Sequence, residues 1–161
     1  MTSITLGDDL AGYLQKALEI ERGFETLSEW EGYVGVKEKE LREVLFQLVT
    51  DSAQHGRTVE TLLDMVRTTA DFRGLPLQPR GFNFRAKGEA EIMNEISRTE
   101  NIMFDLYSDI RDALRNSDMS SLLISPDDAS SFMTSLDGLI NDEARHISII
   151  SKYVRKLDRL R

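Results

Sequence analysis

A chain of 161 residues with a formal net charge of −8 is about one domain long and strongly acidic. The charge argues against nucleic acid as a partner, because nucleic-acid binding depends largely on Lys and Arg side chains that neutralise the phosphate backbone. The sequence has no cysteine, which excludes disulfides, thiolate-zinc sites, a catalytic thiol and iron-sulfur clusters held by this chain. We therefore expect residues 1–161 to form a single domain, and any redox chemistry to need an external electron donor.

The sequence also gives no sign of a membrane segment or a targeting peptide. Its first residues have neither a basic flank nor a long apolar run. No segment approaches the roughly 20 apolar residues that a membrane span requires. We expect a soluble, cytoplasmic protein without a membrane partner.

Four long segments carry apolar residues at spacings of three and four, and no run of alternating polarity competes with them. These predicted helices span about residues 9–33, 37–71, 88–116 and 125–157. The fourth has a clear start, with Ser125 as the expected N-cap and Pro126 in the first helical position. The fold should be all-α.

The lengths of the connections predict the topology. The first and second helices are joined by a short turn, and the third and fourth by a modest loop. The connection over residues 72–87 contains Gly and Pro and is long enough to cross the bundle. Two antiparallel helical hairpins with one crossover between the second and third helices result.

A helix advances about 100° per residue, and this geometry places polar side chains on the apolar stripe of each predicted helix. In chain order these inward polar residues are Glu21, Ser52, His55, Glu100, Tyr107, Glu143 and His146. Counting from the turns places them at similar heights along the helices. They should converge in one layer.

The most specific part of this pattern is the pair Glu143 and His146. Residues three apart on a helix are neighbours, so this carboxylate and this imidazole can hold one ion between them. Three carboxylates buried at one depth also need positive charge to compensate their negative charge, and a bound metal supplies it most directly. Taken singly, an inward histidine is more often a hydrogen-bonded core residue, and Tyr107 is a core aromatic with a paired hydroxyl.

At these residues the sequence resembles the ferritin-like superfamily, particularly its rubrerythrin-type di-iron carboxylate branch. In that family two helices give one Glu each and the other two give a Glu-x-x-His each. Glu21 resembles the first-helix ligand, and the run from Glu100 to Tyr107 resembles the family's Glu-x6-Tyr. Glu143 and His146 match the fourth-helix motif in full.

The resemblance implies a ferritin-like antiparallel four-helix bundle with a mid-bundle metal site. It implies one or two ions of iron, with manganese or zinc as alternatives. Glu21 and His55 would serve one ion, Glu100 and His146 the other, and Glu143 would bridge. The implied activity is that of an oxidase, a peroxidase or an iron-handling protein, with peroxide or dioxygen as substrate and Tyr107 as the catalytic residue.

The second helix departs from the family pattern. Where the family has Glu-x-x-His, this chain has Ser52 three residues before His55. Asp51 is displaced by one residue, about 100° around the helix. A single-metal site is therefore an alternative, and the sequence leaves open whether Asp51 or a water takes the bridging place.

Two other functions fit the same sequence. Loss of the bridging carboxylate at Ser52 favours a bundle that has lost its metal site and serves as a structural or interaction module. The third possibility, a helical binder of an organic molecule, has no positive signal. We also expect a homodimer, for which the apolar residues Trp30, Tyr33, Phe72 and Phe82 are candidate contacts.

Overall fold

The computed structural model describes residues 3–27, 36–71, 84 and 87–159, and throughout this part of the chain the regular structure is helical. Its elements are α1 (Gly7–Leu27), α3 (Lys39–Met65), α4 (Glu89–Arg115), α5 (Met119–Leu122), the 3₁₀ turn η1 (Pro126–Asp128) and α6 (Ala129–Asp158). Extended pairing within the described residues is limited to one isolated bridge between Val66 and Leu123. The all-α prediction is confirmed.

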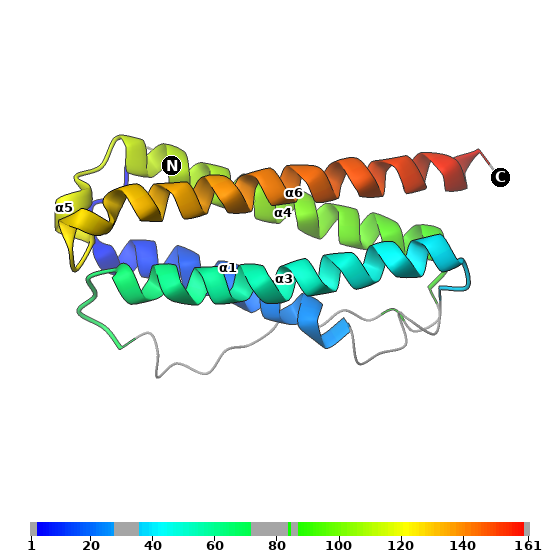
Figure 1. Cartoon of the computed structure of the whole chain (residues 1–161), viewed down its shortest axis with the longest axis horizontal. Helices are drawn as coiled ribbons and strands as arrows, with labels where there is room; N and C mark the ends of the chain where they lie inside the picture. The colour runs from blue at the N-terminus through cyan, green and yellow to red at the C-terminus, as the bar shows by residue number, and fades with distance from the viewer. Residues whose placement is uncertain (1–2, 28–35, 72–83, 85–86, 160–161) are drawn as a thin grey trace.

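The four long helices pack side by side as two antiparallel pairs (Figure 1). α1 packs mainly against α3, and α4 mainly against α6, while further contacts join α3 to α6 and α1 to α4. α3 and α4 run in the same direction, so the end of α3 and the start of α4 lie at opposite ends of the bundle (Figure 1). This arrangement agrees with the predicted hairpins, although most of the connection, residues 72–83 and 85–86, lies outside the described residues.

The end of α3 differs from the prediction. We expected a helix to about residue 71, but α3 ends at Met65 and Val66 adopts an extended conformation. Tertiary pairing replaces the next helical turn: the Arg67 amide donates to the Leu122 carbonyl at 2.8 Å, and the Ile124 amide donates to the Met65 carbonyl at 2.9 Å. The predicted end of the first helix, residues 28–33, lies outside the described residues.

The start of the fourth helix is also more complex than predicted. Pro126–Asp128 form a 3₁₀ turn, α6 begins only at Ala129, and the Ser125 side chain makes no capping hydrogen bond. The short helix α5 before it was not expected. Its cap is Asp118, whose carboxylate accepts a hydrogen bond from the Ser120 amide at 3.1 Å.

A polar layer divides the hydrophobic core into two clusters. One cluster surrounds residues such as Leu14, Leu62 and Phe132, and the other surrounds Phe24 and Leu48. On every long helix the polar layer lies between the two clusters in sequence. Its buried members are Glu21, Ser52, His55, Thr99, Glu100, Glu143 and His146.

Of the predictions about a membrane and about a partner subunit, the structure bears only on the first. None of the described helices combines the length and the apolar character that a membrane crossing needs. The residues expected at a dimer contact, Trp30, Tyr33, Phe72 and Phe82, all lie outside the described residues. The homodimer stays a prediction.

Candidate metal centre

The five predicted ligands lie together in the polar layer. Glu21 comes from α1, His55 from α3, Glu100 from α4, and Glu143 and His146 from α6. Each is at most 2% exposed. They form two overlapping groups, one of Glu21, His55 and Glu143 and one of Glu100, Glu143 and His146, and within each group the ligand atoms lie within 4.8 Å of one another. Glu143 belongs to both groups, which is the pairing that the family resemblance implied.

Both histidines direct Nδ1 towards the carboxylates. His55 Nδ1 lies 3.1 Å from Glu143 Oε1 and 3.4 Å from Glu21 Oε1. His146 Nδ1 lies 3.1 Å from Glu100 Oε2 and 3.7 Å from Glu143 Oε2. The two imidazole rings are stacked, with their centroids 5.6 Å apart. The inner nitrogens therefore share Glu143, while Glu21 faces His55 and Glu100 faces His146.

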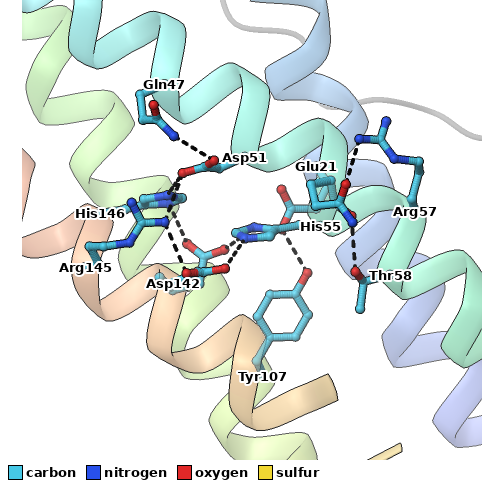
Figure 2. A network of polar contacts seen from close by, with 12 residues as sticks. Glu21, Gln47, Asp51, His55, Arg57, Thr58, Tyr107, Asp142, Arg145 and His146 are labelled. Carbon is cyan, nitrogen blue, oxygen red and sulfur yellow. Dashed lines mark hydrogen bonds and ion pairs between the residues drawn. The ribbon is translucent and has the colours of Figure 1, made fainter. Parts of the chain in front are cut away.

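The outer nitrogen of each histidine contacts an aspartate of the opposite helix (Figure 2). His55 Nε2 on α3 lies 3.3 Å from Asp142 Oδ2 on α6, and His146 Nε2 on α6 lies 2.9 Å from Asp51 Oδ2 on α3. Metal-binding histidines commonly donate their second ring N–H to a carboxylate in this way, which fixes the tautomer and the orientation of the ring. The two contacts are reciprocal between α3 and α6.

Arg145 joins the two aspartates (Figure 2). Its Nη2 donates to Asp51 Oδ2 and to Asp142 Oδ1, each at 3.1 Å. The other oxygen of Asp51 accepts a hydrogen bond from Gln47 Nε2 at 2.8 Å. In this network the Asp51 carboxylate lies against the outer nitrogen of His146 and the guanidinium of Arg145.

Helical periodicity did not indicate Asp142 and Arg145, and it left the position of Asp51 open. A usable signal was present, because an aspartate precedes each histidine by four residues: Asp51 before His55, and Asp142 before His146. Residues four apart lie on one helix face. The repeated Asp-x-x-x-His spacing could have indicated one shared function for the two aspartates.

Ser52 occupies the position on α3 that Glu143 occupies on α6, three residues before the histidine. It is 3% exposed and belongs to the same layer. Within the described part of the chain, the buried carboxylates of this layer are therefore those of Glu21, Glu100 and Glu143. One of two equivalent positions carries a hydroxyl in place of a carboxylate.

Tyr107 holds the Glu21 carboxylate. Its hydroxyl donates to Glu21 Oε1 at 2.8 Å, and its side chain is fully buried (Figure 2). Burial and the negative charge of Glu21 raise the pKa of Tyr107 well above its usual value. The phenol therefore stays protonated and can act as a hydrogen-bond donor to this carboxylate.

The charges of the layer shift the pKa values of its members strongly. Burial alone would lower the pKa of both imidazoles, but the adjacent carboxylates outweigh it and raise the pKa of His55 to about 11 and that of His146 to about 10. Burial opposes ionisation of Glu143 as well, yet its contacts with both histidines and Glu100 lower its pKa to about 2. Burial raises the pKa of Glu21, and raises that of Glu100 well above the usual range.

Two buried carboxylate oxygens of the layer, Glu100 Oε1 and Glu143 Oε2, have no hydrogen-bond partner. His55 Nδ1 contacts Glu143 and Glu21 as ion pairs that lack hydrogen-bond geometry. A buried polar atom without a partner is costly and needs an explanation. Imidazole nitrogens and carboxylate oxygens are the ligands that iron, manganese and zinc accept in proteins. The residues present thus fit a metal ion chemically.

No family model, curated protein or solved structure matches this chain. The likeness to the ferritin-like superfamily consequently stays at the level of the motif residues.

Proposed function

We propose that this chain is a ferritin-like four-helix metalloprotein whose polar layer holds one or two ions of iron or manganese. Glu21 and His55 would bind one ion, Glu100 and His146 the other, and Glu143 would be shared. The observation that carries the proposal is the orientation of the two histidines. Each keeps Nδ1 towards the buried carboxylates, while Nε2 contacts an aspartate of the opposite helix.

The protein would supply ligands, orientation and a dry environment for this centre. The apolar clusters on either side of the layer keep water from the ligands. Tyr107 holds Glu21, and the outer aspartates with Arg145 hold the two imidazoles. A bound iron pair would supply reducing electrons for dioxygen or peroxide, in an oxidase or peroxidase reaction of the rubrerythrin type. An external donor would have to restore those electrons, since the chain has no cysteine.

Metal content per chain tests this proposal directly. The protein is loaded anaerobically with ferrous iron, desalted and analysed by elemental mass spectrometry. We expect between one and two equivalents in the unmodified protein, and almost none in a double variant with His55→Ala and His146→Ala. Glu43→Gln is the matched control, because Glu43 is an exposed carboxylate on the same helix as His55. Protein that stays free of iron, manganese and zinc would contradict the proposal.

The second candidate is a structural or interaction module, and one observation favours it. The two imidazoles are protonated without any metal, because their pKa values are about 11 and about 10. Their positive charges already compensate much of the negative charge of the three carboxylates. A module of this kind should bind no iron, and its thermal stability should not respond to added metal or chelator.

A further inference from the structure

The two ligand groups of the polar layer are assembled from different parts of the chain. The α4–α6 half consists of Glu100, Glu143 and His146, all of which lie on two helices that pack directly against each other. The α1–α3 half consists of Glu21 and His55, and it obtains its second carboxylate only by sharing Glu143 with the other hairpin. The α4–α6 half is therefore complete within one hairpin, and two of its ligands are neighbours on one helix face.

The carboxylate oxygens of the two halves also differ in their partners. Glu100 Oε1 and Glu143 Oε2 have no hydrogen-bond partner, and Glu143 Oε2 is the oxygen that faces His146 Nδ1, at 3.7 Å. In the α1–α3 half, the Glu21 oxygen that faces the histidine already accepts a hydrogen bond from the Tyr107 hydroxyl at 2.8 Å. A metal ion bound to this oxygen would have to share it with the phenol. The α4–α6 half thus offers more free ligand capacity.

The two histidines are supported unequally on their outer sides. His146 Nε2 lies 2.9 Å from Asp51, whose side chain is 19% exposed and is also held by Gln47. His55 Nε2 lies 3.3 Å from Asp142, whose side chain is 46% exposed and therefore more strongly screened by water. On the inner side each Nδ1 has a carboxylate oxygen at 3.1 Å, so that contact does not distinguish the halves. His146 is the better oriented of the two imidazoles, and an oriented ligand loses less freedom when it binds.

We propose that the α4–α6 half binds the first metal ion and that the α1–α3 half binds a second, weaker and exchangeable ion. The inference rests on the proposed function and adds a form of regulation to it. At limiting metal the chain would carry a single ion, held by Glu100, Glu143 and His146. A reaction that needs an ion pair would then proceed only at metal concentrations that fill the α1–α3 half.

The order of loading can be observed directly, because the chain contains only two histidines. Protein with ¹⁵N-labelled histidine is titrated with zinc(II), which is diamagnetic, and the Nδ1 resonances report coordination of each ring by NMR. We expect the His146 resonance to change up to about one equivalent and the His55 resonance to change only beyond it. His55→Gln assigns the two signals, and His146→Gln gives the same assignment if the first variant does not fold.

A matched pair of variants tests the same order through affinity for ferrous iron, measured anaerobically by competition with a chelator. Glu100→Gln should weaken binding of the first ion by about tenfold or more, because it removes a ligand of the α4–α6 half. Glu21→Gln should leave the first ion within about threefold of its original affinity and weaken the second. Each variant removes one buried carboxylate from an equivalent position, so a general effect of lost charge would act on both alike.

The outcomes separate this inference from the proposed function. Protein that binds neither zinc, iron nor manganese would contradict the proposed function. If metal binds but both histidine resonances change together, or His55 changes first, the order is wrong while the metal centre stands. An equal or larger loss of first-ion affinity in Glu21→Gln than in Glu100→Gln would also overturn it. Should zinc stop at one equivalent, the change must be that of His146, and coordination of His55 alone would refute the assignment.

Discussion

The two ring nitrogens of each histidine in the polar layer contact different partners. The outer nitrogens contact Asp51 and Asp142, and Arg145 connects these two aspartates. The side chain of Arg145 is 47% exposed, so its two ion pairs contribute little to the stability of the fold. Its contacts nevertheless hold Asp51 and Asp142, which in turn hold His146 and His55. We infer that Arg145 positions the two histidines proposed as metal ligands without itself serving as a ligand.

Replacement of Arg145 by Leu should therefore lower metal affinity while leaving the fold intact. Loss of such outer partners typically costs 10- to 100-fold in affinity, and we expect a decrease of about this size. Competition with a chromophoric chelator measures the affinity, and urea unfolding of the metal-free protein should change by less than about 1 kcal/mol. Arg115→Leu is the control, since Arg115 is also exposed and lies beside an aspartate, but outside the layer. Equal affinities of the two variants would show that Arg145 has no positioning role.

The first residue of α1, Gly7, lies very close to the backbone that follows α3. A Cβ atom built on Gly7 would lie 1.8 Å from the carbonyl oxygen of Arg67, in the segment that follows α3. Asp8 strengthens the same junction, because its carboxylate accepts a hydrogen bond from the Thr69 amide at 2.8 Å. Only glycine allows α1 to begin against this backbone.

Gly7→Ala should destabilise the protein by about 1–3 kcal/mol, because the added methyl group forces the backbone of one segment to move. Gly12→Ala is a matched control on the same helix, where the added Cβ would meet nothing within 4 Å. That control should be neutral or stabilise by about 0.5–1 kcal/mol, since alanine is the better helix former. Urea unfolding measures both. A Gly7→Ala variant as stable as Gly12→Ala would refute the close approach.

Helical periodicity predicts those features of the site that depend on a single helix. It places Glu21, Glu100 and His146 on inward faces because a helix fixes the direction of each side chain relative to its neighbours. It does not predict where α3 ends, because Val66 continues the apolar pattern and leaves the helix only to pair with Leu123. Nor does it predict the function of Asp51, which depends on the contact with His146 of another helix. The orientation of the imidazole rings and the contacts between helices cannot be predicted from one helix, because they depend on how the helices pack together.

Across the described part of the molecule, a charged layer lies between two apolar clusters, and under the proposed function protons and metal ions would compete for it. At pH 7 both imidazoles are protonated in the metal-free protein, because their pKa values are about 11 and about 10. A protonated Nδ1 has no lone pair for a metal, so filling both halves of the site should release at least about two protons. Calorimetric titration with metal in buffers of different ionisation enthalpy measures this number. Binding without proton release would contradict the assigned ligands.

The raised pKa values of His55 and His146 also determine how the stability of the metal-free protein depends on pH. The pKa of each histidine in the folded protein lies above the 6.5 of a free imidazole. Their contribution to metal-free stability is therefore fully present below about pH 6.5 and is lost as the pH rises through about 10 to 11. Metal affinity changes in the opposite direction, because fewer protons must be displaced at higher pH. The rise in melting temperature caused by metal should consequently be larger at about pH 9 than at about pH 6, and a smaller rise at the higher pH would show that the histidines are not ligands.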